Sequence, residues 1–230
     1  MSPIRLVLFD VDGTLVLGNR GLRRWFEAAL VEVFGQAGDI DGHSFSGKID
    51  PQIVNELLSA AGLSQDEIDA GLPAAKEAYL KRLKRNLRPK DLRLLPHVVQ
   101  TLELLEQRQE VALGLLTGNW EAGARTKLDC FGLNRFFPFG AFSDGQRSRR
   151  DLPPIALDRA TEITGERFEP AETLIVGDSV LDVECARQNK MRCLAVATGY
   201  TPAEELASAG PDWVIGDLRE AANFLPLFRS

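Results

Sequence analysis

The chain contains few of the residues on which several kinds of site depend. Its 230 residues include three cysteines, and these follow no CxxC spacing. An odd number of scattered cysteines does not form a disulfide framework, so we expect a reducing compartment and buried thiols. The two histidines, His43 and His97, do not accompany a recognisable serine or cysteine nucleophile. A serine or cysteine hydrolase is therefore unsupported.

Long apolar runs and a basic surface are also missing. No segment approaches the ~18 uninterrupted apolar residues of a membrane-spanning helix, and the first residues lack the features of a signal peptide. The formal net charge is −6, which disfavours nucleic-acid binding because such surfaces are basic. With 44% hydrophobic and 26% charged residues, the composition is typical of a globular protein. We expect a cytoplasmic protein without membrane or nucleic-acid partners, and the sequence predicts no particular oligomeric state.

Short apolar runs alternate with helical patterns along most of the chain. The runs are too short for helices and rich in aliphatic side chains, which is typical of buried strands: residues 4–9, 111–116, 173–176, 192–196 and 213–215. Apolar side chains recur at helical spacing between them, in residues 96–106, 154–164 and 182–189. This alternation predicts parallel βαβ units, with helices covering both faces of one sheet.

Residues 17–92 interrupt the alternation. They contain no good strand run, but three stretches carry an apolar helical face, at residues 25–34, 53–58 and 74–87. We therefore predict an α/β core of residues 1–16 and 93–230, with a helical cap of residues 17–92 inserted between its first and second strands.

Acidic and hydroxyl side chains follow three of the predicted strands. Asp10 and Asp12 come after the first strand, Thr117 after the second, and Asp178 and Asp182 after the third. Ligands of an open parallel sheet bind at the carboxyl ends of its strands, so these groups are expected to converge. Clustered carboxylates repel one another unless a cation lies among them. Because all the ligands are oxygen atoms, the sequence predicts Mg²⁺, with Asp10 and Asp178 as side-chain ligands.

The spacing of Asp10 and Asp12 suggests a division of labour. In an extended chain, residues two apart project from the same face, so one carboxylate can attack a substrate while the other handles the proton. Gly13 allows the backbone to turn sharply and to approach a phosphate closely.

These segments resemble the motifs of the haloacid dehalogenase superfamily, in its phosphatase branch. Its first motif, DxDGT, matches residues 10–14; the Ser or Thr of its second motif matches Thr117; and its fourth motif, GDxxxD, matches residues 177–182. The resemblance extends from residue 4 to about residue 217 and is phosphoglycolate-phosphatase-like. It implies a Rossmannoid parallel-sheet core with an inserted α-helical cap.

The resemblance also implies a mechanism. Asp10 would attack phosphorus and form an aspartyl-phosphate. Asp12 would protonate the leaving oxygen, then deprotonate the water that clears the intermediate. Its backbone carbonyl would also contact Mg²⁺, which Asp10 and Asp178 bind, with Asp182 as a further acid. The substrate would be bound by Thr117 and by the loop residues Gly13, Thr14, Gly118 and Asn119.

The third motif departs from the family pattern, which usually places a Lys before a helix. Here residues 147–154 contain no Lys, but Arg149 and Arg150 precede the two prolines. Either guanidinium can neutralise a nucleophile and a phosphate, and can do so with two hydrogen bonds. Both arginines are therefore candidates, and we expect only one of them to act.

Three positions have both a functional and a structural interpretation. Lys48 lies where similar caps carry a basic residue facing the active site, so it either meets the substrate or is solvated. Asp50 matches the acid of the same segment of those caps, but we expect it to cap the helix that begins near Pro51. Asn119 either orients the leaving group or caps the following helix.

The sequence thus predicts hydrolysis of a small phosphomonoester. A cap over the site excludes water and large substrates, which favours a free metabolite over a phosphoprotein. A phosphosugar mutase remains an alternative, as does a metal- or phosphate-binding module without turnover. A dehalogenase is disfavoured because dehalogenating relatives lack an acid at the position of Asp12.

Overall fold

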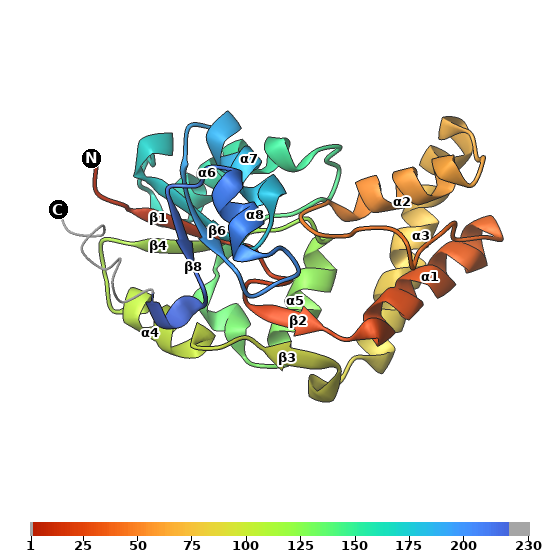
Figure 1. Ribbon diagram of the computed structural model, residues 1–230, viewed down its shortest axis with the longest axis horizontal. Helices are drawn as coiled ribbons and strands as arrows, with labels where there is room; N and C mark the ends of the chain where they lie inside the picture. Colours follow the sequence, from red (N-terminus) through yellow and green to blue (C-terminus); the bar gives the residue numbers. More distant parts are fainter. Residues whose placement is uncertain (1, 221–230) are drawn as a thin grey trace.

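A computed structural model describes residues 2–220 of the chain, so the last ten residues of the predicted core lie outside the description. Its centre is a six-stranded sheet in the order β5-β4-β1-β6-β7-β8, with every neighbouring pair parallel (Figure 1). The strands are β1 (Leu6–Phe9), β4 (Ala112–Leu116), β5 (Phe139–Ala141), β6 (Thr173–Gly177), β7 (Arg192–Val196) and β8 (Trp213–Ile215).

The alternation of side chains along β1 divides the core into two layers. Val7 and Phe9 belong to a cluster that includes apolar side chains of α4 (Val98–Glu106) and α5 (Glu121–Asp129). Leu6 and Leu8 point to the opposite face, where they join α6 (Leu152–Thr164) and α7 (Val180–Gln188). Both faces of the central strand are buried, which explains its continuous apolar run. The predicted α/β fold is confirmed.

The cap consists of α1 (Arg20–Phe34), α2 (Asp50–Ala60) and α3 (Gln65–Asn86), which lie together to one side of the sheet (Figure 1). These helices share a separate hydrophobic cluster. In α3, Ser64 forms a capping box with Glu67, and the helix continues through Pro73, which the sequence pattern had placed before the helix. The exact boundaries of the core (residues 1–16 and 93–230) and of the cap (residues 17–92) remain a prediction.

Two short strands join the helical segment to the core. β2 (Val16–Gly18) pairs with β3 (Leu92–Leu94) in an antiparallel ribbon. The expectation that residues 17–92 lack strands is therefore wrong at both ends. The edge strand β5 and the helix α8 (Ala203–Ser208) were also not predicted, because a run of three to six residues gives too little periodicity to recognise.

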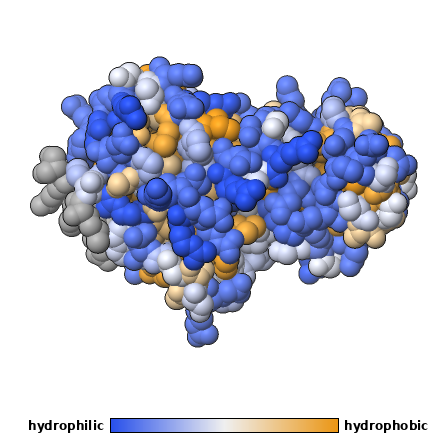
Figure 2. All heavy atoms as spheres, turned by 90° about the horizontal axis from the view of Figure 1, so that it is seen from above, coloured by the Kyte–Doolittle hydropathy of each residue, from blue (hydrophilic) through white to orange (hydrophobic). Residues whose placement is uncertain are grey.

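The surface seen in Figure 2 is predominantly hydrophilic. Among residues 2–220, the large hydrophobic side chains that are exposed come from four separate segments: Val31, Leu104, Ile163 and Tyr200. Among residues 2–220, no helix combines the length and apolar character needed to cross a membrane. Cys185 and Cys193 are buried free thiols, as expected, whereas Cys130 is half-buried.

Candidate active site

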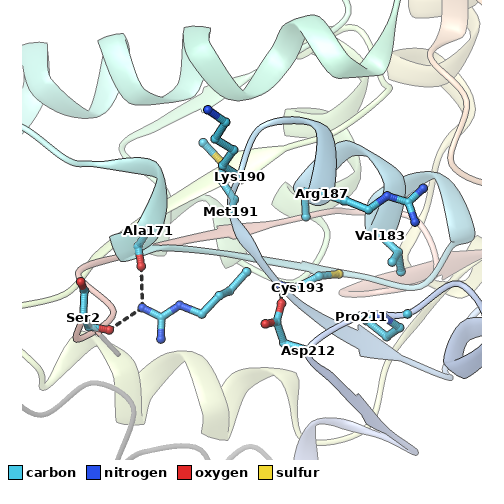
Figure 3. Close-up of a pocket in the computed structure, with 12 residues that line it drawn as sticks. Ser2, Ala171, Val183, Arg187, Lys190, Met191, Cys193, Pro211 and Asp212 are labelled. Atoms are coloured by element: carbon cyan, nitrogen blue, oxygen red, sulfur yellow. Dashed lines mark hydrogen bonds between the residues drawn. The ribbon is translucent and has the colours of Figure 1, made fainter.

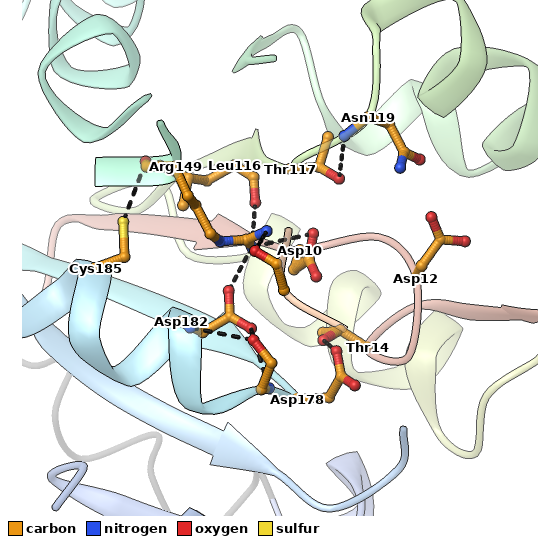
Figure 4. Close-up of polar contacts among 12 residues, drawn as sticks. Asp10, Asp12, Thr14, Leu116, Thr117, Asn119, Arg149, Asp178, Asp182 and Cys185 are labelled. Carbon is orange, nitrogen blue, oxygen red and sulfur yellow. Dashed lines mark hydrogen bonds and ion pairs between the residues drawn. The ribbon is translucent and has the colours of Figure 1, made fainter. Parts of the chain in front are cut away.

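Three buried carboxylates meet at the carboxyl ends of β1 and β6. Asp10, Asp178 and Asp182 each offer an oxygen atom, and these atoms all lie within 4.8 Å of one another (Figure 4). Asp10 directly follows β1 and Asp178 directly follows β6, and the two strands are paired in register. The parallel pairing therefore brings together acids that are 168 residues apart, as the sequence predicted.

Asp182 is held by its own helix. The N-cap of α7 is Ser179, whose hydroxyl oxygen accepts a hydrogen bond from the Asp182 backbone N–H at 3.2 Å. In return, Asp182 Oδ2 accepts from the Ser179 backbone N–H at 3.1 Å and from its hydroxyl at 2.6 Å. This capping box leaves Oδ1 to face the guanidinium of Arg149. Asp182 thereby fixes a cation beside the nucleophile candidate.

The first-motif loop closes tightly over Asp178. Gly13 has a φ of +89°, and a Cβ at this position would lie 2.3 Å from Asp178 Oδ2. Only glycine fits that conformation and that approach. The Thr14 hydroxyl donates to Asp178 Oδ1 at 3.4 Å, and the Thr198 hydroxyl donates to the Gly13 carbonyl at 2.6 Å. The loop is thus locked beside the carboxylates.

Of the two candidate arginines, Arg149 reaches the carboxylates. Its guanidinium lies 3.3 Å from Asp10 Oδ1, contacts Asp182, and donates to the Leu116 carbonyl at 3.3 Å and the Gly47 carbonyl at 3.2 Å. Its Nε is buried without a hydrogen-bond partner among the described residues. Arg150 is exposed. Both arginines lie in the short 3₁₀ turn Arg149–Asp151, and of the two only Arg149 is buried.

The electrostatics of the cluster reflect burial. Burial raises the pKa of Asp10 from 3.8 to about 6, against the opposing charge of Arg149. Burial also raises the pKa of Asp178 to about 8, with additional repulsion from Asp10 and Asp182. One guanidinium therefore does not compensate the three acids. A hard divalent cation would do so, and the buried, all-oxygen donor set fits such an ion.

The second-motif loop lies under the cap. Thr117 is buried, and its hydroxyl oxygen accepts from the Asn119 backbone N–H at 3.4 Å. A Cβ on Gly118 would lie 2.1 Å from the Lys48 carbonyl oxygen, and the Gly118 carbonyl accepts from the Asp50 backbone N–H at 2.7 Å. The cap loop is therefore seated directly on the loop that carries Thr117.

The capping role expected for Asp50 is wrong, and of the two roles left open for Asn119 the capping role is excluded. The N-cap of α2 is Ile49, without a side-chain cap, and Asp50 Oδ2 instead accepts from the Trp120 backbone N–H at 2.9 Å. Asp50 thus satisfies the first turn of α5 from across the cap–core boundary, a pairing that local sequence does not reveal. Asn119 does not cap α5, since its N-cap is Trp120. Its side-chain oxygen accepts from Lys127 at 2.8 Å.

Lys48 is neither free nor fully solvated. Its ammonium group pairs with Glu56 of α2 and lies 3.3 Å from His43 Nε2, and its side chain is 20% exposed. Lys48, which the sequence left as either substrate-binding or solvated, is therefore engaged within the cap.

One buried cation was missed from the sequence. Lys127 of α5 is 5% exposed and forms an ion pair with Asp12. Burial alone lowers the pKa of a lysine, but the charges of Asp12, Tyr79 and Asp50, together with the hydrogen bond to Asp12, outweigh this and raise the pKa of Lys127 above its usual range. A signal was available, because Lys127 lies between Ala124 and Leu128 on the apolar face of a helix, where a lysine is rarely found without a partner.

A separate pocket of about 550 Å³ opens near the amino end of β7, away from the carboxylates (Figure 3). Its lining includes Arg187, Lys190 and Asp212. Arg192 is already bonded to the carbonyls of Ser2 and Ala171. The pocket contains none of the acids described above.

Comparison with known proteins matches residues 7–196 to the model of the haloacid dehalogenase-like hydrolases. The chain belongs to this family. It is 31% identical to phosphoglycolate phosphatase 1 of Pseudomonas aeruginosa over 94% of this chain and 78% of that protein. It is also 26% identical to a pyrophosphatase of Oceanobacillus iheyensis, over 94% of each chain.

The fold is shared with solved structures. A structure described as a predicted phosphatase from Clostridium acetobutylicum has a TM-score of 0.74 and 20% identity, covering 98% of this chain and 99% of that one. The prediction of a haloacid dehalogenase-like phosphatase is therefore confirmed for family and enzyme class, and a cluster of acids able to hold a metal ion is present.

Proposed function

We propose that this haloacid dehalogenase-like hydrolase removes phosphate from a small phosphomonoester, with Asp10 as nucleophile and Mg²⁺ as cofactor. The observation that carries the proposal is the buried cluster at the sheet edge, in which Asp10 lies beside Asp178, Asp182 and the guanidinium of Arg149. A nucleophile next to cations, in a loop with close backbone approach, is what transfer of a phosphoryl group requires.

The chemistry is two successive displacements at phosphorus. An oxygen of Asp10 bonds to phosphorus while the bond to the leaving oxygen breaks, and Asp12 gives that oxygen a proton. Water then attacks phosphorus in the aspartyl-phosphate as Asp12 takes a proton from it. The products are an alcohol and inorganic phosphate, and both carboxylates return to their starting state.

The metal site would consist of Asp10, Asp178 and the backbone carbonyl of Asp12. When bound, Mg²⁺ neutralises charge on the transferring phosphoryl group and orients it. Asp182 acts through Arg149, because its oxygens are used by the capping box and the guanidinium. We assign the role of the third-motif cation to Arg149.

The remaining loop residues would hold the phosphoryl oxygens. Thr117 would donate its hydroxyl and Gly118 its backbone N–H. Gly13 and Thr14 form the opposite wall, locked against Asp178. Asn119 would act on the site through Lys127, to which its side chain is bonded.

The substrate is expected to be a small cytoplasmic metabolite. The cap loop is packed on Gly118, which leaves little space for a macromolecule. Since relatives include a phosphoglycolate phosphatase and a pyrophosphatase, phosphoglycolate and pyrophosphate are the first compounds to test.

The test is release of inorganic phosphate from a panel of phosphomonoesters and pyrophosphate, with Mg²⁺ or with EDTA. Wild type, Asp10→Asn and the control Asp158→Asn, an exposed acid on α6, are compared. The proposal expects Mg²⁺-dependent release by wild type and the control, and loss in Asp10→Asn. Absence of release from every compound, or an isomerised sugar phosphate without free phosphate, would overturn hydrolysis.

A further inference from the structure

Lys127 is a buried cation in contact with the proposed acid–base group. It lies on α5, outside the residues matched to the family motifs, and its side chain is 6% exposed. Its Nζ donates to Asp12 Oδ2 and, at 2.8 Å, to Asn119 Oδ1. Burying an ammonium group is costly unless it is paired and hydrogen-bonded, so these two contacts fix both the lysine and its partners.

The contact constrains the Asp12 carboxylate. Asp12 follows β1 in a loop, and its side chain is 38% exposed, so packing alone does not fix its rotamer. Lys127 lies in the last turn of α5, and its ammonium group binds one oxygen of the carboxylate. That contact also sets the direction of the other carboxylate oxygen, Oδ1. A fixed direction is what proton transfer requires, because Asp12 must reach a leaving oxygen and later a water.

Lys127 also lies near acidic and phenolic groups of the cap. The charges of Asp50 and Tyr79 act on it, yet its hydrogen bonds go to Asp12 and Asn119 of the core. Asp50 uses its carboxylate to accept from the Trp120 backbone N–H. The direct partners of Lys127 are therefore on the catalytic side of the boundary.

We propose that Lys127 is a positioning residue that holds the Asp12 carboxylate in place for proton transfer, with Asn119 orienting Lys127. This inference rests on the proposed phosphohydrolase function. The proposal explains why the side chain of Asn119 bonds to Lys127 instead of capping α5. It also gives a role to a residue of α5, a helix that lies outside the motif loops.

The first experiment compares steady-state kinetics of Lys127→Met with those of Lys84→Met, an exposed lysine on α3, and wild type. Methionine keeps the apolar stem and removes the charge. Misplacement of a catalytic group by about 1 Å can cost on the order of 100-fold, so we expect kcat to fall about 10- to 100-fold while KM changes little. Unchanged kcat, or a change confined to KM, overturns the proposal.

The second experiment identifies Asp12 as the group through which Lys127 acts. An alkyl phosphate needs a proton on its leaving oxygen, whereas p-nitrophenyl phosphate has a leaving group that departs with little assistance. The Lys127→Met defect should be larger for the alkyl phosphate. In an Asp12→Asn background, measured with p-nitrophenyl phosphate, adding Lys127→Met should change the rate by less than about 2-fold, because contacting groups are not additive.

If Lys127→Met lowered the rate by the same factor in wild type and in Asp12→Asn, the two losses would be independent. Lys127 would then only support packing. If Lys127→Met is poorly folded, the double variant Lys127→Met/Asp50→Asn is used instead, because it also removes the charge of the neighbouring acid. Failure of this inference is distinct from failure of the proposed function: wild type without Mg²⁺-dependent turnover refutes the latter, whereas active wild type with a fully active Lys127→Met refutes only the former.

Discussion

Replacing Arg149 by methionine should destabilise the protein and abolish turnover. The guanidinium is the cation in contact with Asp10 and Asp182, and it also bonds to the carbonyls of Leu116 and Gly47. Removing one partner of a buried ion pair costs about 3–5 kcal/mol, because the other charge remains buried. For a chain of this size each kcal/mol lowers Tm by about 2–4 °C, which predicts a decrease of roughly 6–20 °C.

The loss should depend on pH with a definite sign. Without Arg149 the acids are neutralised by protons instead, and the pKa values of Asp10 and Asp178 are already raised by burial, to about 6 and about 8. At pH 5 these two acids are largely protonated in the folded state, so less of the cluster's charge is left unpaired. At pH 8 more charge is uncompensated. The difference in Tm between wild type and Arg149→Met should therefore be larger at pH 8 than at pH 5.

The adjacent Arg150 provides a matched control, since it is exposed and differs from Arg149 by one position. Thermal unfolding followed by circular dichroism, together with phosphate release, is measured for Arg149→Met, Arg149→Lys and Arg150→Met. Arg149→Lys should retain part of the stability, because one ammonium group cannot span all four partners. Equal Tm values for Arg149→Met and Arg150→Met would refute the assignment.

Three further predictions concern other parts of the molecule. Burial raises the pKa of Asp50 to about 7, so its contribution to stability is present below about pH 4 and is lost as pH rises through 7. Urea titrations should show that the free energy of unfolding falls less over this pH range in Asp50→Asn than in wild type. An equal fall in both proteins would contradict the assignment. Trp120→Ala should lower the free energy of unfolding by about 3–5 kcal/mol, since Trp120 of the core is buried in the cap cluster beside Phe26 and Tyr79; a loss under 1 kcal/mol would show that the cap is not anchored there. Mg²⁺ at about 100 times its Kd should stabilise wild type by about 2.7 kcal/mol but leave Asp178→Asn nearly unchanged, as measured by differential scanning calorimetry; an equal shift in both would place the ion elsewhere.

The sheet and the acid cluster could be predicted because their determinants are local. Each strand is a short apolar run, and each motif directly follows a strand, so parallel pairing alone brings Asp10 beside Asp178. The family resemblance added the roles of these residues. Short elements such as β5 left no periodic signal, because three residues cannot distinguish a strand from a loop.

The partners of the charged side chains around the site could not be predicted. Asp50 was expected to cap its own helix, but its partner is the Trp120 backbone N–H, 70 residues away. Within the core, Lys127 pairs with Asp12 from 115 residues away, and within the cap Lys48 pairs with Glu56 of α2. Such pairs depend on the tertiary arrangement of the chain, which the spacing of residues within one segment does not contain.

The central claim, that Asp10 is a covalent nucleophile, is tested most directly by trapping the intermediate. The enzyme is mixed with Mg²⁺ and phosphoglycolate, or with whichever compound of the panel it hydrolyses, quenched in acid during turnover, and digested for mass spectrometry. The account predicts a phosphoryl group on the peptide containing Asp10, absent from Asp10→Asn. Turnover with no phosphorylated peptide, or with the phosphoryl group on another residue, would contradict it.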